Sequence, residues 1–383
     1  MKILIVSRVY THPIDKGNSR AIFAQAEALK SLGNDVHFLY IDECHPRYNA
    51  KQYEIGREET KKYWGEKFHY FKKNKIEKYW NVFVKKIIRG GVYWKPNDYY
   101  PWGLHNYVNK LQKVHHFDAC IVNYFDLSKL LTKITIPKKA LHTHDSFTYR
   151  DIITGATQNI RALTPNDEAI VLQRAPYIFA LQDGDAEFFH RLSPKSKIYT
   201  IYTTITFHPQ PIVGNHNILF LSANEIFNIN GLDWFLENVY LKLQEIVPDA
   251  KLLIGGGICK GIKERNLSKG VILCGYVDDV GDFFQQGDIA INPVYQGTGL
   301  KIKTIESMSY DKVTIVHPHS QEGLFSKEKQ PLLASERPSD WINYIIQVWN
   351  NQNMISVIKK ENQRYIESMN SYILEEYKKF MED

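Results

Sequence analysis

Short apolar runs alternate with helix-like segments along this chain, and that alternation decides what it can fold into. Residues 3–6 form a continuous apolar run, residues 22–29 place apolar side chains on one helical face before Gly33, and residues 36–41 form a second apolar run. A strand, a helix and a strand in this order predict a βαβ unit, which builds a parallel sheet covered by helices. The same half of the chain contains four more candidate strands, at 120–122, 140–142, 178–181 and 198–201.

The alternation restarts after residues 207–211, Phe-His-Pro-Gln-Pro, where two prolines interrupt both the helical and the strand period. With 383 residues, the chain is long enough for two domains of ordinary size. We therefore predict an α/β protein with two Rossmann-like, doubly wound parallel-sheet domains at 1–206 and 207–340, and a helical segment at 341–383. The predicted strands of the second domain are 218–221, 252–254, 271–273, 289–291 and 313–316, with helices at 232–247, 280–285 and 300–310.

Composition sets the expected cellular location. The longest apolar runs fall well short of the roughly 20 residues that a membrane-spanning helix needs. The first six residues, Met-Lys-Ile-Leu-Ile-Val, are too short and too quickly polar for a signal peptide. The four cysteines have neither paired nor metal-ligand spacing. These features predict a cytoplasmic protein with reduced thiols, either soluble or bound peripherally to the inner face of the membrane.

The positive charge is concentrated in one segment. The whole chain carries a formal charge of +6, yet the segment from Arg57 to Lys95 has twelve Lys or Arg and four Asp or Glu, which gives 12 − 4 = +8. A local basic patch favours an anionic partner. Within it, residues 75–89 predict a helix with an apolar face and an opposite basic face. The apolar face is Ile76, Tyr79, Trp80, Phe83 and Ile87, and the basic face is Lys78, Lys85, Lys86 and Arg89.

Two interpretations of this helix stay open. It can lie peripherally on an anionic membrane on the cytoplasmic side, which suits an acceptor carried on a lipid. Alternatively, its apolar face packs on the first domain and its lysines are solvated.

A glycine-rich turn precedes the predicted helix at 300–310. The sequence Gly297-Thr298-Gly299-Leu300 opens this helix, so backbone N–H groups and the positive end of the helix dipole can face an anion. Lys303 lies near the helix start and Glu306 lies three residues on, nearly on the same face. This pair suits the diphosphate and the ribose of a nucleotide. An ordinary helix start with a surface Lys–Glu pair is the alternative.

The second half of the chain resembles the retaining glycosyltransferase family 4, which has the GT-B fold. The resemblance rests on the wording, order and spacing of five blocks, at 228–236, 247–252, 275–279, 297–306 and 321–324. It implies two Rossmann-like domains that face a central cleft. The first domain would bind the acceptor, the second would bind a nucleotide-sugar donor, and the C-terminal helical segment would pack back toward the first.

The resemblance also implies roles for individual residues. Glu306 matches the second Glu of the family's Glu-x7-Glu motif, which holds the donor ribose, and Lys303 matches a donor-phosphate lysine. His144, after a predicted strand, matches the sugar or acceptor side of the cleft and is the one catalytic candidate. The other implied donor-binding residues are Gly17 on the loop facing the phosphates, Gly275, Tyr276 and Val277 at the base, and Thr298, Gly299, Leu300 and Lys301 at the helix start.

This sequence departs from the family pattern at two places. Thr298 stands where the first Glu of the motif belongs, so the usual charged contact with the transferred sugar is missing. Asn224, Glu225 and Asn230 occupy the region of the usual Arg/Lys pair, which leaves lysines 301 and 303 as the main cationic candidates.

Three weaker features have structural explanations. Asp183-Gly184-Asp185 resembles a metal-binding Asp-x-Asp motif, but it falls at a predicted helix start, where Asp is favoured, so no essential metal or cofactor is expected. The glycines at 255–257 suit either a ligand contact or a tight turn. His142 alternates with His144 on one strand, where packing is the ordinary explanation.

These observations together predict a glycosyltransferase that moves a sugar from a nucleotide-sugar donor to a glycan, a lipid-linked or a protein acceptor. The resemblance implies that the transfer retains the anomeric configuration. The alternatives are a GT-B sugar-nucleotide epimerase and a non-catalytic partner subunit on a glycosyltransferase scaffold. A nicotinamide dehydrogenase is disfavoured because no Gly-x-Gly-x-x-Gly follows the first strand. No feature predicts a nucleic-acid partner.

Overall fold

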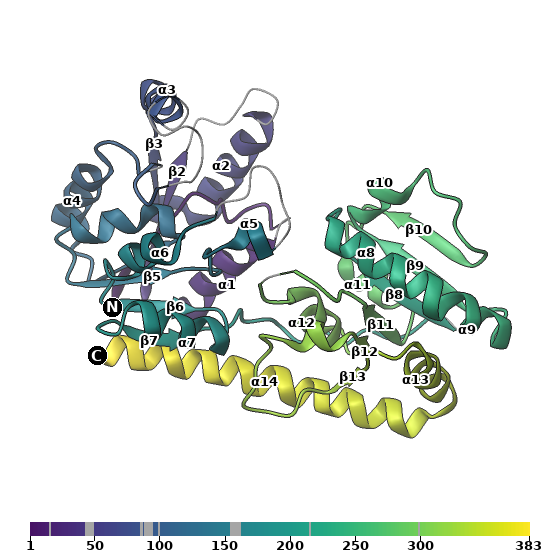
Figure 1. Cartoon of the computed structure of the whole chain (residues 1–383). Helices are drawn as coiled ribbons and strands as arrows, with labels where there is room; N and C mark the ends of the chain where they lie inside the picture. Colours follow the sequence, from purple (N-terminus) through teal and green to yellow (C-terminus); the bar gives the residue numbers. More distant parts are fainter. Residues whose placement is uncertain are drawn as a thin grey trace. The chain divides into compact units, whose positions relative to one another are not determined.

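The computed structural model divides the chain into two compact units, shown in Figure 1. The first comprises Met1–Thr204 and Tyr372–Asp383, and the second comprises Ile205–Ser371. The predicted junction at 207–211 follows the first boundary along the chain. The described residues are 1–14, 17–42, 50–84, 87, 95–98, 100–153, 162–213, 216–297 and 299–383.

The first unit is built on a seven-stranded sheet with the order β3-β2-β1-β4-β5-β6-β7, in which every pair of neighbours is parallel. All the strands predicted for this half are confirmed, and the edge strand β3 is an addition. The strands are β1 (Lys2–Ser7), β2 (Asp35–Asp42), β3 (Phe68–Lys72), β4 (Ala119–Asn123), β5 (Lys138–His142), β6 (Tyr177–Ala180) and β7 (Lys197–Thr200).

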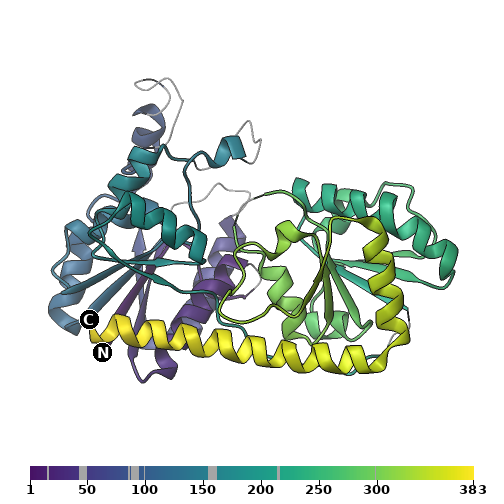
Figure 2. The same ribbon diagram turned by 60° about the horizontal axis from the view of Figure 1, so that its bottom comes forward.

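Helices cover both faces of this sheet, because apolar side chains from the parallel strands are buried on each side. One face packs Leu4 and Val122 against α4, η4, α6 and α7. The other face meets α1 and the last turns of α14, which are yellow in Figure 2. The helices are α1 (Gly17–Ser31), α2 (Ala50–Trp64), η2 (Gly65–Lys67), α3 (Lys75–Phe83), α4 (Leu104–His115), η4 (Phe125–Thr132), α5 (Arg150–Ile153), α6 (Pro165–Leu172) and α7 (Asp183–Leu192).

The second unit contains a six-stranded parallel sheet with the order β10-β9-β8-β11-β12-β13. The five predicted strands are confirmed, and the short edge strand β13 is again an addition. The strands are β8 (Asn217–Leu221), β9 (Lys251–Gly255), β10 (Val271–Gly275), β11 (Ile289–Asn292), β12 (Val313–Val316) and β13 (Leu332–Ala334).

Helices also flank this sheet, and Trp341 is the largest fully buried side chain of the core on one face. The predicted helix at 232–247 begins earlier, at Ile226, and contains a π-helical turn. The helical elements are α8 (Ile226–Phe235), η5 (Leu236–Tyr240), α9 (Leu241–Ile246), α10 (Ile258–Ile262), α11 (Val280–Phe284), α12 (Ile302–Ser309), η6 (Pro318–Gln321), α13 (Pro338–Asn350) and α14 (Gln352–Glu382).

Helix α14 belongs to both units. Residues up to Ser371 lie in the second unit, and from Tyr372 the helix is part of the first. Its end packs into the first core, where the rings of Tyr377 and Phe380 meet Phe179 edge-on at centroid distances of 5.7 and 4.9 Å. The C-terminal segment thus completes the fold of the first unit.

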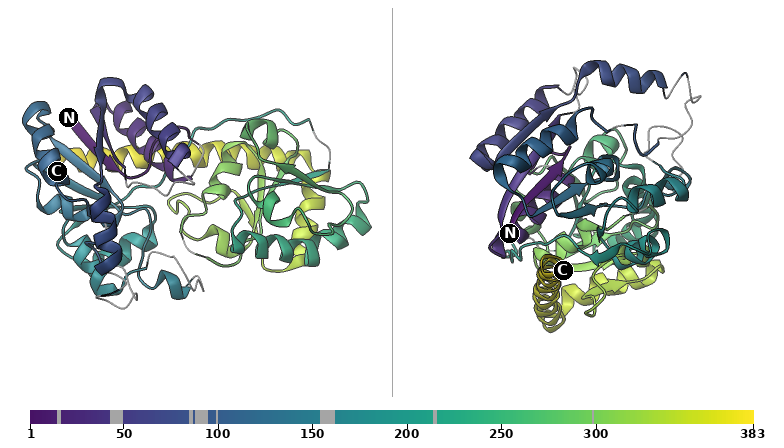
Figure 3. Two further views of the ribbon diagram at one scale, coloured as in Figure 1. Left: turned by 90° about the horizontal axis from the view of Figure 1, so that it is seen from above. Right: turned by 90° about the vertical axis from the view of Figure 1, so that its left-hand side faces the viewer.

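Helix α3 presents its apolar face to solvent. Tyr79 is 75% exposed and Trp80 is 51% exposed, and Ile76, Phe83 and Ile87 are exposed as well. The inward-packing interpretation is therefore wrong for these residues. Glu77 explains the orientation, because it is fully buried, pairs with Lys73 at 3.4 Å and accepts the Trp102 backbone N–H at 3.0 Å. Figure 3 shows α3 lengthwise at the outer edge of its unit in the right-hand view.

The contribution of α14 to the first unit is testable by truncating Phe380. The substitution Phe380→Ala should lower the free energy of unfolding by about 3–5 kcal/mol, because the ring is fully buried in a packed core. The exposed neighbour Lys378 is the matched control, and Lys378→Ala should change stability by less than about 0.5 kcal/mol. Urea denaturation measures both, and equal stability of the two variants would refute this role for the helix end.

Candidate functional site

Each sheet reverses its strand order once, and that reversal places the candidate sites. In the first unit β1 lies between β2 and β4, and in the second unit β8 lies between β9 and β11. Connections leave opposite faces at such a point, so a crevice opens beyond the carboxyl ends of the two central strands. The candidate groups are therefore the residues that follow β8 and β11 in the second unit, and those that follow β4 and the neighbouring β5 in the first.

Lys303 is the central charged group of the second unit. It lies in the first turn of α12, and its Nζ donates hydrogen bonds to Ser222 Oγ at 2.9 Å and to Asn228 Oδ1. Its ammonium also lies 5.5 Å from the ring centroid of Phe220. Burial lowers the pKa of Lys303 to about 7, although the carboxylate of Glu225 opposes the shift. Among the described residues, the hydrogen-bond acceptors of Lys303 are the neutral oxygens of Ser222 and Asn228, so an anionic ligand would favour its charged form.

The glycine-rich turn before α12 has backbone angles that favour glycine. Gly297 and Gly299 have φ values of 113° and 79°, which side chains other than glycine rarely adopt. The residue at the N-cap position of α12 is Lys301, whose side chain makes no capping hydrogen bond. Lys301 is buried and donates to the Gly299 carbonyl at 3.0 Å, so it braces the turn. Thr298 lies outside the described residues.

Glu306 shares a small cavity with Lys303. The cavity, of about 10 Å³, lies against β8 and β11, and the rest of its lining is Ser307 and the apolar side chains of Leu219, Leu221, Phe284, Ala290 and Ile291. One turn of helix therefore brings the carboxylate of Glu306 and the ammonium of Lys303 to the lining of one cavity. Leu300 lies in the glycine-rich turn before α12 and is half-buried.

The ends of β9 and β10 complete the surroundings of β8. Gly275 has a φ of 73°, and its carbonyl accepts the Gly256 N–H at 2.8 Å. Beyond it, Tyr276 is 70% exposed, whereas Val277 packs in the core between β9 and α11. A Cβ on Gly256 would lie 2.5 Å from the Ser222 carbonyl oxygen. Close backbone approach therefore accounts for the glycine at 256, and this approach fixes the loop that holds Lys303.

His144 is the central candidate residue of the first unit. It follows β5 with a φ of 64°, and Tyr124 after β4 has a φ of 73°. The His144 ring is stacked between those of Tyr124 and His142, at centroid distances of 4.4 and 4.1 Å. Its Nε2 is 2.6 Å from Asn123 Oδ1. Two non-glycine residues in left-handed conformations at neighbouring strand ends are typical of a functional site.

The two histidines are neutral. Burial lowers the pKa of His144 to about 3, and burial together with His144 lowers the pKa of His142 well below its usual range. His144 can therefore exchange hydrogen bonds with a substrate hydroxyl, and it does not supply a positive charge near neutral pH.

Two other predicted features, the glycine before the first helix and the Asp-x-Asp sequence, lie at helix starts in the first unit. Gly17 is the exposed first residue of α1, and nothing lies within 4 Å of a Cβ built on it. Asp183 and Asp185 lie in the first turn of α7. Burial, with Asp145 nearby, raises the pKa of Asp185 to about 7. Among the described residues, no group of three or more His, Cys, Asp or Glu side chains could hold a metal ion.

Sequence reasoning missed the residues that support these groups. Ser222 and Asn228 hold Lys303, and Asn123 and Gln25 contact the two histidines. The available signal was a polar residue at the carboxyl end of a buried strand, as at Asn123 and Ser222, because such residues lie at the ligand-binding edge of a parallel sheet.

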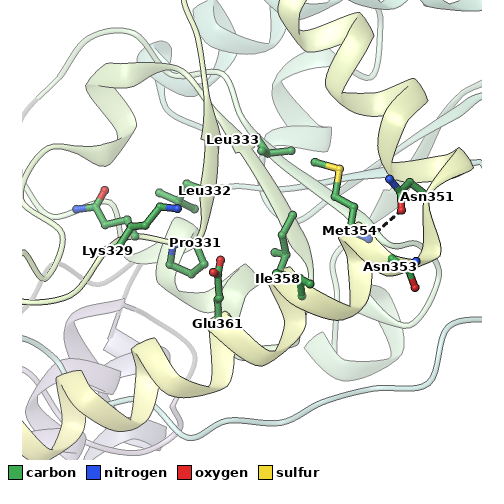
Figure 4. A pocket seen from close by; sticks show the side chains of 11 residues that line it. Lys329, Pro331, Leu332, Leu333, Asn351, Asn353, Met354, Ile358 and Glu361 are labelled. Atoms are coloured by element: carbon green, nitrogen blue, oxygen red, sulfur yellow. Dashed lines mark hydrogen bonds between the residues drawn. The ribbon is translucent and has the colours of Figure 1, made fainter.

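The second unit also contains a larger pocket of about 410 Å³ in a different place (Figure 4). It lies between the segment leading into β13 and the start of α14. Leu332, Met354 and Ile358 form its apolar part, and Lys329 and Glu361 flank it. None of the predicted donor-binding residues lines this pocket, so it has no part in the site around Lys303.

Comparison with known proteins gives the class of the second unit. Residues 215–351 match the family model described as Glycosyl transferases group 1. An uncharacterized 44.6 kDa protein from the cps region of Klebsiella pneumoniae is 25% identical over 144 residues. That match covers 34% of this chain and 37% of the relative, so this chain spans little more than a third of the relative's length. The match to the glycosyl transferases group 1 model is thus confined to residues of the second unit, the half of the chain in which the sequence blocks resemble a glycosyltransferase family.

Solved structures resemble the whole chain. TarM of S. aureus has a TM-score of 0.69 at 12% identity and covers 100% of this chain and 99% of its own. Sucrose-phosphate synthase from Thermosynechococcus elongatus has a TM-score of 0.65 at 12% identity, with 100% and 98% covered. The pneumococcal O-GlcNAc transferase GtfA, in complex with UDP and GlcNAc, has a TM-score of 0.64 at 12% identity, with the same coverage. The predicted GT-B fold with two Rossmann-like domains is confirmed.

The pKa of Lys303 predicts how nucleotide-sugar binding depends on pH. A diphosphate favours the ammonium and raises this pKa in the complex, so affinity should be constant below about pH 7 and fall as the pH rises above it. Between roughly pH 6 and pH 8.5 the loss should be about tenfold or more. Titration calorimetry with a nucleotide sugar measures this, because its phosphates are diesters without the ionisation near pH 6.

The control for this prediction is Lys303→Arg. Arginine stays charged throughout this range, so its variant should bind with little pH dependence. Equal wild-type affinity at both ends of the range would contradict a titrating Lys303 in the site.

Proposed function

We propose that this protein is a glycosyltransferase that takes a sugar from a nucleotide-sugar donor bound in the second unit. The observation that carries the proposal is the position of Lys303 and Glu306 on α12, at the reversal point of the sheet, inside the segment that matches the glycosyltransferase model. Lys303 would bind the diphosphate and Glu306 the ribose hydroxyls. A uridine nucleotide is the first donor to test, because the GtfA structure contains UDP.

The chemistry would depend mainly on holding the leaving diphosphate. Bond breaking at the anomeric carbon builds negative charge on the diphosphate, and a fixed ammonium beside an uncapped helix N-terminus stabilises that charge. We assign retention of anomeric configuration and membership of family 4 on the resemblance of the sequence blocks. Gly17, Gly275, Tyr276 and the turn residues 298–301 remain proposed donor contacts.

His144 is the proposed catalytic residue of the first unit. Its clamped, neutral imidazole can accept or donate one hydrogen bond to a hydroxyl of the sugar or the acceptor. The acceptor class remains a glycan, a lipid-linked glycan or a protein.

Donor binding and transfer are tested in sequence. A thermal-shift screen of UDP-, GDP-, ADP- and CMP-sugars should show one base that raises the melting temperature, because a bound ligand stabilises the native state. Product analysis with that donor then separates the alternatives. Slow hydrolysis or transfer supports a transferase, a new sugar nucleotide from the donor alone supports an epimerase, and no turnover of a bound donor supports a non-catalytic partner.

Two substitutions should weaken donor binding. Lys303→Ala removes a charge-assisted contact worth about 1.5–3 kcal/mol, and Glu306→Ala removes the acceptor for the ribose hydroxyls, so each should lower affinity about tenfold or more. Lys260→Ala, an exposed lysine on α10, is the matched control and should bind normally. Binding and activity should survive EDTA, since helix amides and lysine meet the phosphate charge. Unchanged affinity in both site variants would remove the proposed clamp.

We further propose that α3 docks on an anionic membrane surface. The exposed apolar residues of α3 lie within the segment that carries a net charge of +8, and Trp102, which is 54% exposed, joins them beside Glu77. Aromatic and basic side chains together favour the interface of an anionic bilayer. Among the described helices, none is both long and apolar enough to cross a bilayer. Peripheral contact would suit a lipid-linked acceptor.

Vesicle co-sedimentation tests this docking. The full chain should bind vesicles that contain anionic lipid, and changing Lys78, Lys85 and Lys86 to Glu should weaken binding about a hundredfold or more, at roughly 1 kcal/mol per lysine. Replacing Tyr79, Trp80 and Phe83 by Ser should abolish binding with little change in melting temperature, because these rings are exposed.

Val114 is the control for the apolar residues, since it is 71% exposed on α4. Val114→Ser should bind like the wild type. A wild-type protein that ignores anionic vesicles, or a serine variant that unfolds, would contradict the docking proposal while leaving the donor site untouched.

A further inference from the structure

Four buried or half-buried polar side chains form a continuous hydrogen-bonded chain in the first unit. His144 Nε2 meets Asn123 Oδ1 at 2.6 Å, Asn123 Nδ2 meets Gln25 Oε1 at 3.1 Å, and Gln25 Nε2 meets His142 Nδ1 at 2.7 Å. These residues come from the ends of β4 and β5 and from the middle of α1. Gln25 is 3% exposed, His142 is 2% exposed and Asn123 is fully buried, so water does not compete for these contacts.

A backbone carbonyl fixes the direction of this chain. Asn123 Nδ2 also points to the Val6 carbonyl oxygen at 3.5 Å, and a carbonyl can only accept. The amide nitrogen of Asn123 therefore faces Val6 and Gln25, and its oxygen faces His144. Since Oδ1 can only accept, His144 must donate from Nε2. The same logic makes Gln25 a donor to His142 Nδ1.

The far end of the chain is compatible with this direction. A His142 that accepts at Nδ1 carries its proton on Nε2, which is buried in the core. His142 lines a small cavity together with Thr203 and Tyr202. His142 Nε2 and the Thr203 hydroxyl are both buried without a hydrogen-bond partner among the described residues, and one bridging water would pair them.

We propose that Gln25 and Asn123 are positioning residues that hold His144 in the Nε2–H tautomer, so that its Nδ1 lone pair is the group that accepts a hydrogen bond from a substrate hydroxyl. The inference rests on the proposed function of His144 and names the atom that would perform it. The sugar or acceptor that binds there must then present a hydroxyl donor to Nδ1. An oxygen that can only accept, such as a carboxylate or a glycosidic oxygen, is disfavoured at that position.

The surroundings of His144 leave little room for the ring to turn over. Tyr124 and His142 stack on its two faces, with interplanar angles of 23° and 18°. A 180° flip keeps the ring in the same plane and restores both stacks, but it would carry Nε2 away from Asn123 and break that hydrogen bond. The stacking therefore fixes the plane of the ring, and the bond to Asn123 selects its orientation and its tautomer.

Nuclear magnetic resonance of histidine side chains tests the tautomer in the wild-type protein. The full chain is labelled with ¹⁵N-histidine, the His144 signals are assigned by their loss in His144→Gln, and two-bond ¹H–¹⁵N correlations distinguish a protonated from an unprotonated ring nitrogen. We expect His144 near neutral pH to show a protonated Nε2 and an unprotonated Nδ1. A protonated Nδ1, or a mixture of tautomers, would overturn the inference.

Two substitutions at Gln25 separate positioning from packing. Gln25→Met keeps the length of the side chain and removes its hydrogen bonds, which leaves the Asn123 amide nitrogen with only the long contact of 3.5 Å to the Val6 carbonyl. The Asn123 amide can then turn over, so His144 should become a mixture of tautomers. Gln25→Glu can only accept, so it still receives Asn123 Nδ2–H; His144 should keep its tautomer while the proton of His142 moves to Nδ1. If Gln25→Met leaves His144 in a single Nε2–H form, or Gln25→Glu changes it, the chain does not set the tautomer. Should the Met variant unfold, the wild-type and Glu spectra still decide.

Kinetics provide a second readout. Gln25→Met should lower kcat about tenfold, as expected for a lost hydrogen bond in the transition state, and change the donor KM much less, because the proposed diphosphate and ribose contacts of Lys303 and Glu306 lie in the second unit. Gln25→Glu should restore most of kcat. A protein that transfers no sugar while showing the expected tautomer would refute only the proposed function. Transfer by a protein with the other tautomer would refute only this inference.

Discussion

Parallel strand pairing is the constraint on which the candidate sites depend. In a parallel sheet every carboxyl end lies at one edge, and the order of both sheets reverses between β1 and β4 and between β8 and β11. The polar groups described above cluster at these reversals. Asn123 ends β4, Ser222 follows β8, and α12 begins shortly after β11. The sheets therefore set the places where candidate ligand-binding side chains can come together. The loops that follow the strands determine which side chains lie there.

Within the second unit, the site is assembled by contacts distant in sequence. Lys303 depends on Ser222 and Asn228 for its position, and the loop containing Ser222 depends on a glycine at 256 for close approach. Burial without a strong anionic partner makes the lysine costly to charge, and an arriving diphosphate would remove that cost. The same arrangement that destabilises the ammonium in the free protein would favour donor binding.

Regular elements with strong periodicity were predictable, and the exceptions have physical reasons. The buried strands 3–6 and 218–221 stand out because their apolar runs are continuous. The edge strand β3, with the sequence FHYFK, lacks a continuous apolar run, and the edge strand β13 has only three residues. The predicted helix is confirmed over Lys75–Phe83, and the side chains of its predicted basic face, at 78, 85, 86 and 89, lie outside what the structure describes. Periodicity alone does not say which face turns inward, and the buried pair of Glu77 and Lys73 decides that in α3.

For the site, Lys303 and Glu306 followed from helical spacing and the resemblance, and His144 from its strand end. Their partners were hidden because Asn123, Gln25 and Asn228 are single polar residues whose roles arise only when distant strands and helices pack together. The central claim is that the α12 pair binds a donor diphosphate and ribose. A crystal structure of the full chain with a bound UDP-sugar tests it most directly. The account predicts phosphate oxygens within hydrogen-bond distance of Lys303 Nζ and ribose hydroxyls on Glu306. A nucleotide bound elsewhere, for example in the pocket between β13 and α14, would contradict it.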